Sequence, residues 1–326
     1  MTLVLDDATV RSVFDWREAV VALREAYSQD PNPARFPARR IARGDHGWLR
    51  TLSGVPGGDA PMGLKIIAAS PRNNRVSYLI PLFDQRSAQL LALLDGHSIT
   101  GYRTAATTAL AADALTPAGA LSVAVIGSGF EARNHVRALA AVRELKSVTV
   151  YSPRAESRAA CVAALDDVAA TIRPAESAHA AVEVADVVIC AARSRDETPT
   201  FLGAWLRPGM TVLSIGSTVP EQREVDVDVI ERADRIVVDV LEEVLEETGD
   251  LIAARAEGVD ATGKTVTLAD LVSGRCAGRE RDDQIVLYKS VGSALQDLAV
   301  AEMCMRAAER GDVGTRFELG LKPVEK

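Results

Sequence analysis

One stretch of ten residues decides the fold of this 326-residue chain: Val123-Ala124-Val125-Ile126-Gly127-Ser128-Gly129-Phe130-Glu131-Ala132. An apolar run typical of a buried strand leads directly into the pattern G-x-G-x-x-A, and a helical stretch follows. The glycines permit a tight turn and a close approach of the backbone to a pyrophosphate, which the positive end of the helix attracts. A second predicted strand at 147–151 makes a purely structural turn the weaker alternative. The stretch therefore predicts a dinucleotide-binding turn of the Rossmann type.

Short β-branched runs continue outward from this turn and alternate with helical stretches. These predicted strands lie at 121–126, 147–151, 186–191, 211–215 and 235–240. They lack strict alternation, as strands do when both faces of a parallel sheet are covered. One more strand at 285–288 leads into a long final helix. The rhythm predicts an α/β fold with a doubly wound parallel sheet.

The chain before this region has a different pattern. Apolar residues at helical spacing predict one helix over 9–28, and an alanine-rich helix is predicted at 98–115. Between them, residues 36–95 contain short, partly alternating apolar runs separated by Gly and Pro, which indicate an antiparallel sheet. The whole chain therefore combines a Rossmann-type domain with a second, α+β domain.

Composition excludes several classes of protein. Hydrophobic residues make up 48% and charged residues 25%, which is ordinary globular usage. The net charge of −8, without long like-charge runs, argues against nucleic-acid and anionic-membrane partners. No apolar run approaches the ~20 residues that cross a bilayer, and the start lacks an export signal. The cysteines are unpatterned and the histidines lack ligand spacing, so we expect no metal and a cytoplasmic location.

The end of the second predicted strand bears on the choice of cofactor. NAD enzymes usually carry an acidic residue there, and none is present. Ser152 can donate to a phosphate, while Arg154 and Arg158 can pair with its charge. We therefore expect NADP(H) in preference to NAD(H). NAD(H) stays possible, because Arg154 at a helix start can equally be a solvated side chain.

Residues 95–106, Asp95-Gly96-His97-Ser98-Ile99-Thr100-Gly101-Tyr102-Arg103-Thr104-Ala105-Ala106, resemble the DG-x-x-[IL]-T-x-x-RTAA signature of the ornithine cyclodeaminase/μ-crystallin family. The resemblance covers nearly the whole chain. Further stretches fit in order: Gly63-Leu64-Lys65, the glycine turn, Arg223-Glu224-Val225-Asp226, Glu247-Thr248-Gly249-Asp250 and Lys289-Ser290-Val291-Gly292. The resemblance implies a dinucleotide-binding domain at 117–292 and a substrate-binding and dimerisation domain built from 1–116 and 293–326. It also implies a homodimer.

The resemblance further implies that Arg39, Lys65 and Arg103 line the substrate pocket. Fixed cations suit the carboxylate of an amino or imino acid, since an unpaired buried anion is very costly. Each has a simpler alternative: a solvated face for Arg39, an outward-facing edge position for Lys65, and a structural pair for Arg103. Lys65 could also relay a proton to the substrate nitrogen if burial depresses its pKa. Glu242 matches a ligand-facing glutamate of the μ-crystallin branch, although an acidic helical run is usually solvated.

One departure from the family pattern limits the reaction. Thr218, in Ser214-Ile215-Gly216-Ser217-Thr218-Val219-Pro220, stands where cyclodeaminases and archaeal alanine dehydrogenases of the family carry an aspartate. A threonine hydrogen-bonds but cannot act as a base near neutral pH. Oxidation of an amino acid and cyclisation need such a base more than reduction of a protonated imine does. The departure favours reduction.

We therefore expect an NADP(H)-dependent oxidoreductase that reduces a small imino or 2-oxo acid to an amino acid, with Lys65, Arg103 and Thr218 as catalytic candidates. Two alternatives stay open: an NAD-dependent, ammonia-releasing cyclodeaminase, and a μ-crystallin-like protein that binds NADPH and a ligand without turnover. The residues expected to contact the dinucleotide are Arg103, Thr104, Gly127, Ser128, Gly129, Phe130, Glu131, Ser152, Arg154, Cys190, Ala191, Gly216, Ser217, Lys289 and Ser290.

Overall fold

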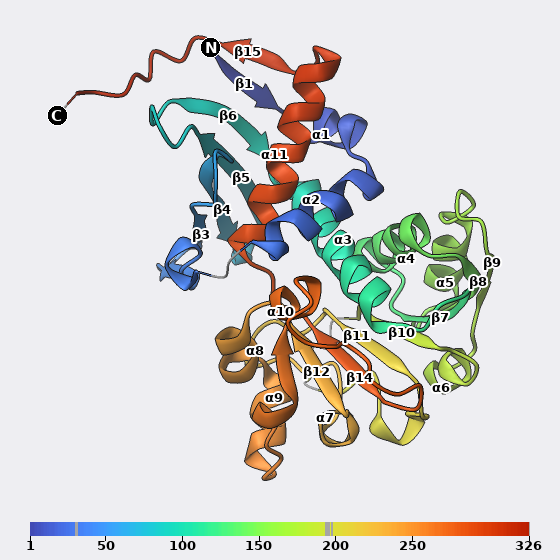
Figure 1. Ribbon diagram of the computed structural model, residues 1–326. Coiled ribbons are helices and arrows are strands. Elements are labelled where there is room, and N and C mark those ends of the chain that lie inside the picture. Colours follow the sequence, from blue (N-terminus) through green and yellow to red (C-terminus); the bar gives the residue numbers. More distant parts are fainter. Residues whose placement is uncertain (30–31, 193–195, 197, 326) are drawn as a thin grey trace. The chain divides into compact units, whose positions relative to one another are not determined.

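The computed structural model describes residues 1–29, 32–192, 196 and 198–325, and the chain forms two compact units. The first unit comprises Met1–Arg103 and Ser293–Lys326, and the second comprises Thr104–Gly292. In Figure 1 the first is blue to teal and red, and the second runs from green to orange. The boundary falls inside helix α3 (His97–Leu115), whereas the sequence pattern places it after that helix.

The first unit is built on a seven-stranded sheet. In sheet order its strands are β15 (Thr315–Phe317), β1 (Thr2–Leu5), β6 (Leu90–Asp95), β5 (Arg75–Phe83), β4 (Met62–Ser70), β3 (Trp48–Gly54) and β2 (Arg40–Arg43). Strands β2 to β6 pair antiparallel, which confirms the sheet predicted at 36–95. Two strands are additional: β1 runs parallel to β6, and β15 pairs with β1. Both are too short to show an alternating pattern.

The predicted single helix over 9–28 is wrong, because the chain forms two helices there. These are α1 (Asp7–Val13) and α2 (Trp16–Ser28), with Phe14 in an extended conformation between them. Asp15 caps α2, accepting a hydrogen bond from the backbone nitrogen of Glu18 at 2.9 Å. The Phe14 ring packs against Trp16 and Tyr102, with ring centroids 4.7 and 4.5 Å away. A new cap and an aromatic contact therefore outweigh the continuous helical spacing.

The last long helix, α11 (Ala294–Gly311), packs against β3, β4 and β5 of the first unit. Two glycines, Gly54 on β3 and Gly63 on β4, lie opposite each other in the sheet. A Cβ added at either position would meet the side chain of Leu298, at 2.9 and 3.0 Å. The pair of glycines thus gives α11 room to approach the sheet closely, and this places the buried residues of its first turns against β4.

The second unit contains an eight-stranded sheet in which all strands pair parallel. In sheet order its strands are β13 (Thr265–Thr267), β12 (Arg235–Val238), β14 (Val286–Lys289), β11 (Thr211–Ser214), β10 (Val187–Cys190), β7 (Leu121–Ile126), β8 (Leu145–Tyr151) and β9 (Thr171–Pro174). All six predicted strands are present, and the edge strands β9 and β13 are additional. The doubly wound α/β prediction is confirmed. The order reverses between β7 and β10, and such a switch point is where open α/β sheets bind ligands.

Helices connect the strands of the second unit. They are α4 (Phe130–Val142), α5 (Ala155–Ala163), α6 (Ala178–Val182), α7 (Val227–Arg232), α8 (Leu241–Glu247), α9 (Gly249–Ala256) and α10 (Leu268–Val272). Short 3₁₀ helices lie at Pro33–Arg35, Pro71–Asn73, Gly203–Trp205 and Thr262–Lys264.

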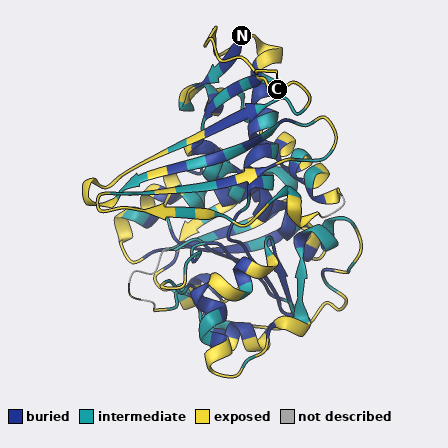
Figure 2. Ribbon diagram, turned by 90° about the vertical axis from the view of Figure 1, so that its left-hand side faces the viewer, coloured by how far each residue is buried: buried dark blue, intermediate teal, exposed yellow. Residues whose placement is uncertain are grey.

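Burial differs between the two sheets. The central strands of the parallel sheet are buried along their length, whereas the long antiparallel strands of the first unit carry exposed residues, drawn yellow in Figure 2. Leu49, Val76 and Leu79 are each more than 40% exposed on these strands.

Within the part of the chain that the structure describes, every helix is too short or too polar to cross a bilayer. The same residues contain no group of three or more His, Cys, Asp or Glu placed to hold a metal ion.

Candidate active site

A buried cluster of charges lies in the first unit, where β4, α3 and α11 meet. The Nζ atom of Lys65 lies 2.8 Å from Oδ1 of Asp297, and Nε of Arg103 lies 2.9 Å from the same oxygen. Lys65 is 1% exposed, Arg103 6% and Asp297 not at all. One carboxylate oxygen thus holds two cations that come from different elements.

The strand pattern explains why Lys65 points inward. On β4 the residues Gly63, Lys65 and Ile67 are buried, while those between them are half-buried. Successive residues of a strand face opposite sides of the sheet, so Lys65 shares the covered face with its two buried neighbours. Strand β4 lies between β3 and β5. The alternative of an outward-facing lysine on an edge strand is therefore wrong.

Further polar residues surround this pair of cations. Arg103 donates to Oε1 of Gln296 at 2.5 Å, and Nε2 of Gln296 donates to the hydroxyl of Tyr27 at 2.8 Å. Arg39 is half-buried, unlike its exposed neighbour Arg40, and its charge acts on Lys65. The structure therefore brings together the three cations predicted for the substrate carboxylate. It adds Gln296 and Asp297, which the sequence patterns did not single out.

The cluster carries more positive than negative charge, since Lys65 and Arg103 both contact the carboxylate of Asp297 and the charge of Arg39 acts on Lys65 as well. Burial lowers the pKa of Lys65 to about 8, Arg103 and Arg39 lower it as well, and Asp297 opposes them. A carboxylate ligand would offset part of this positive surplus. A lysine with a pKa close to neutral pH is also suited to donate or accept a proton.

The glycine turn of the second unit has the features that a pyrophosphate needs. Gly127 has φ of +129°, and a Cβ there would come within 2.7 Å of the carbonyl oxygen of Ala191. Gly129 precedes α4, no side chain caps that helix, and a Cβ on Gly129 would meet nothing within 4 Å. The first backbone N–H groups of α4 therefore lack a side-chain acceptor, and the space beside Gly129 is open. These features fit a bound phosphate.

The residues at the end of β8 are also suited to a phosphate. Ser152 is 8% exposed, and its Oγ has no hydrogen-bond partner among the described residues. Arg158 donates to the carbonyl oxygen of Ser152 at 2.7 Å and lies over the ring of Tyr151. Arg154 is exposed, and its Nε donates to Ser157 at 3.2 Å. A buried hydroxyl without a partner suggests that a ligand atom completes the site.

A second buried network lies at the carboxyl ends of β11 and β14. Lys289 contacts Oδ2 of Asp250 at 2.7 Å and donates to Oγ of Ser214 at 3.0 Å. Ser214 donates to Oε2 of Glu224 at 2.7 Å, and the same oxygen accepts from the backbone of Gly216 at 2.9 Å. Glu224 and Asp250 lie in two of the family-like motifs, but neither was predicted as a site residue.

Glu224 fixes the turn that carries Gly216, Ser217 and Thr218. A Cβ on Gly216 would lie 2.2 Å from Oε1 of Glu224, so only glycine fits beside this carboxylate. Burial raises the pKa of Glu224 to about 7, opposed by Lys289, Ser214 and the Gly216 amide. The glutamate therefore takes up a proton near neutral pH while it holds the turn.

The remaining candidates also lie in the second unit. Thr218 is half-buried, and its hydroxyl has no partner among the described residues; Ser217 donates to the carbonyl oxygen of Gln222. Ser290 donates to Asp239 at 2.6 Å. Cys190 ends β10 and is fully buried. Thr104, Ser128 and Glu131 are half-buried, and Phe130 is exposed. Glu242 is exposed in the first turn of α8.

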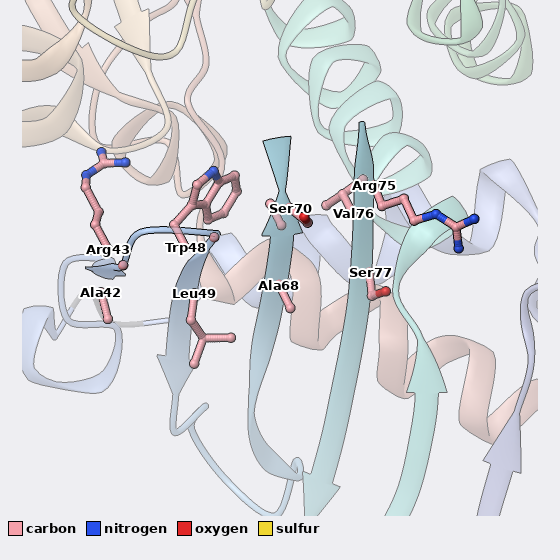
Figure 3. A pocket seen from close by; sticks show the side chains of 12 residues that line it. Ala42, Arg43, Trp48, Leu49, Ala68, Ser70, Arg75, Val76 and Ser77 are labelled. Atoms are coloured by element: carbon pink, nitrogen blue, oxygen red, sulfur yellow. The ribbon is translucent and has the colours of Figure 1, made fainter. Parts of the chain in front are cut away.

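One pocket of the first unit contains none of the candidate residues. It encloses about 590 Å³ on the antiparallel sheet. Figure 3 shows that its labelled residues come from neighbouring strands of this sheet, among them Trp48, Leu49 and Val76. Its lining is mostly apolar, and its two arginines, Arg43 and Arg75, come from β2 and β5 on opposite sides of the pocket.

Comparisons with known proteins agree with this arrangement. A model of the ornithine cyclodeaminase/mu-crystallin family matches residues 7–312. A Delta(1)-pyrroline-2-carboxylate reductase of Bacillus cereus is 33% identical over 277 residues, covering 82% of this chain and 83% of that protein. The Thermococcus litoralis Delta(1)-pyrroline-2-carboxylate reductase, solved with NADH and L-proline, superposes with a TM-score of 0.88. It is 27% identical and covers 97% of this chain and 100% of that one. An archaeal alanine dehydrogenase, solved as a dimer with bound NAD, has a TM-score of 0.87, 26% identity and coverage of 98% and 99%.

Proposed function

Because the chain belongs to the ornithine cyclodeaminase/mu-crystallin family, we propose that it is a nicotinamide-dependent reductase of small cyclic 2-imino acids, with Delta(1)-pyrroline-2-carboxylate as the first substrate to test. The observation that carries the proposal is the buried cluster of Lys65, Arg103 and Asp297, together with Arg39. An imino acid combines a carboxylate with a protonatable nitrogen. The cluster offers surplus cations for the first and a lysine with a pKa of about 8 for the second.

The residues of the second unit fit the dinucleotide. The amides of the Gly127–Gly129 turn and α4 would hold the pyrophosphate, and Ser214 to Thr218 would line the nicotinamide side. When bound, the reduced nicotinamide supplies a hydride to the C=N carbon. Arg39 and Arg103 orient the substrate carboxylate through charge-assisted hydrogen bonds. Lys65 donates a proton to the substrate nitrogen, so that the imine gains one hydride and one proton and becomes an amine.

The proposal includes a preference for NADP(H) over NAD(H). Its support is the end of β8, which carries no acidic residue of its own, and where Ser152 has an unpartnered buried hydroxyl. Arg158 lies next to Ser152 and also pairs with Glu176 at 3.6 Å. A 2′-phosphate would accept from Ser152 and pair with Arg154, whose side chain is exposed. The two relatives solved as complexes contain NADH or NAD, so the preference for NADP(H) is proposed for this chain from its own residues and is not taken from them.

The proposed assembly is a homodimer formed through the first unit. Its support is the exposed apolar side chains of Leu49 and Leu79, which lie on the same face of the antiparallel sheet. An archaeal relative was solved as a dimer. The four cysteines are all free, which supports a reducing compartment such as the cytoplasm.

The test is oxidation of reduced nicotinamide by purified protein, followed by its absorbance. NADPH and NADH are each offered with Delta(1)-pyrroline-2-carboxylate, with its six-membered homologue, and with 2-oxo acids plus ammonia. We expect faster oxidation with a cyclic imino acid than with any 2-oxo acid, and with NADPH than with NADH. Ammonia release from ornithine without net absorbance change would identify a cyclodeaminase instead. Tight NADPH binding that no substrate turns over would identify a binding protein.

A further inference from the structure

Asp297 uses one oxygen for two cations and leaves its other oxygen without a hydrogen-bond partner among the described residues. It reaches Lys65 across a separation of 232 residues in the chain. We propose that Asp297 is the positioning residue of the reaction: it holds Lys65 charged and in place as the proton donor, and it fixes Arg103 as the carboxylate clamp. This inference rests on the proposed function.

The backbone around Asp297 is built to place it. The glycine pair Gly54 and Gly63 admits Leu298, which follows Asp297 directly on α11. Gln296, which precedes it, binds Arg103 and Tyr27. Neighbouring residues on both sides of Asp297 are therefore anchored, and the carboxylate has little freedom to move away from Lys65.

The second buried lysine, Lys289, is a candidate for the dinucleotide site and provides a comparison for Lys65. Lys289 has two partners, Asp250 at 2.7 Å and Ser214 at 3.0 Å. Lys65 is equally buried, but Asp297 is its one hydrogen-bond partner among the described residues. An ammonium group has three N–H donors. Two donors of Lys65 therefore have no acceptor in the described part of the chain, as expected for a group that meets a substrate.

The charges that face Lys65 come from three directions. Arg103 on α3 and Arg39 before β2 both lower its pKa, as burial does, and Asp297 on α11 raises it. Gln296 on α11 and Tyr27 on α2 complete the surroundings as uncharged groups at neutral pH. Without Asp297, nothing in this set would favour the protonated amine. Lys65 would then be neutral at the pH where the enzyme works, and unable to donate a proton.

Asp297→Asn tests this inference, because it keeps the size of the side chain and removes the charge. We expect the alkaline limb of the kcat profile to move down by about one pH unit or more, since a close opposite charge shifts a pKa by ~1–3 units. For a shift of one unit, the kcat at pH 8 should then fall about fivefold more than the kcat at pH 6, and by more for a larger shift. Asp297→Glu keeps the charge, so its limb should stay near that of the wild type while its kcat falls. Glu302→Gln is the matched control, because Glu302 pairs with Arg306 on the outer side of the same helix; it should leave the profile unchanged.

A direct readout does not require activity. In protein labelled with ¹³C at the lysine ε carbons, Lys65→Met assigns the Lys65 signal, and its titration is followed by NMR. We expect a midpoint near 8 in the wild type and a lower midpoint in Asp297→Asn. Equal midpoints, or an equal loss of kcat at every pH, would reduce Asp297 to a structural counter-ion. If Asp297→Asn does not fold, unchanged kcat in Asp297→Glu would overturn the inference. A wild type that reduces no imino acid contradicts the proposed function instead, and the midpoints still test the role of Asp297.

Discussion

Replacing Lys65 by methionine should abolish most activity and change how stability depends on pH. The pKa of Lys65 is about 8 in the folded protein and 10.5 in its ordinary range, so the unfolded chain binds more protons between these values. Burial of the charged lysine therefore destabilises the wild type below pH 8, and this cost is relieved as pH rises toward 10.5. At ~1.36 kcal/mol per pKa unit, the full shift is worth about 3 kcal/mol.

The assay is urea unfolding of wild type and Lys65→Met at pH 7 and pH 10. Packing changes caused by methionine contribute equally at both pH values, so they cancel in the comparison. We expect the free energy of unfolding of the variant, minus that of the wild type, to fall by roughly 2.5 kcal/mol from pH 7 to pH 10. A difference independent of pH would mean that Lys65 is not desolvated, and it would refute the reasoning for both its proton transfer and the role of Asp297.

Three further changes test other parts of the structure. Glu224→Gln should remove one contribution to the pH dependence of the free energy of unfolding. The pKa of Glu224, raised to about 7, makes the wild type lose ~3 kcal/mol of stability as pH rises from 4.5 through 7. Urea unfolding at pH 5 and pH 8 should show this loss in the wild type and not in the variant. Gly63→Ala would bring a Cβ within 2.4 Å of the carbonyl oxygen of Pro81 on β5 and 3.0 Å of Leu298 on α11, and thermal unfolding should report a cost of ~1–3 kcal/mol. Unchanged stability would contradict this close packing around Gly63. Ser152→Ala should lower kcat/KM for NADPH about tenfold, the effect of one charge-assisted hydrogen bond, and leave kcat/KM for NADH nearly unchanged. An equal decrease with both cofactors would argue against a 2′-phosphate at this residue.

The sequence predicts the local elements best. The glycine turn, the six strands around it and the antiparallel sheet are each specified by a few neighbouring residues, and all are confirmed. The break at Phe14 escaped prediction, because the helical spacing of apolar residues continues across it and only the capping side chain of Asp15 marks it. The short strands β1 and β15 depend on partners far away in the chain.

The site is predicted less completely, for the same physical reason. Lys65 and Arg103 belong to short motifs and stand out as cations within apolar segments. Asp297 and Gln296 do not, because an acidic residue and an amide near the start of an amphipathic helix are common in any protein. Their role depends on contacts between α11 and elements more than 190 residues earlier in the chain. The roles of Thr218 and Glu242 stay predictions.

The return of α11 to the first unit also bears on how the protein is made. A ribosome releases Lys65 and Arg103 long before it releases Asp297, so the nascent chain holds two cations whose counter-charge is still unsynthesised. The sheet of the first unit likewise lacks its covering helix at that stage. The residues of the second unit are contiguous in the chain, and all of its strands are synthesised before α11. Synthesis therefore completes the second unit first, and the charged centre of the first unit only with the last helix.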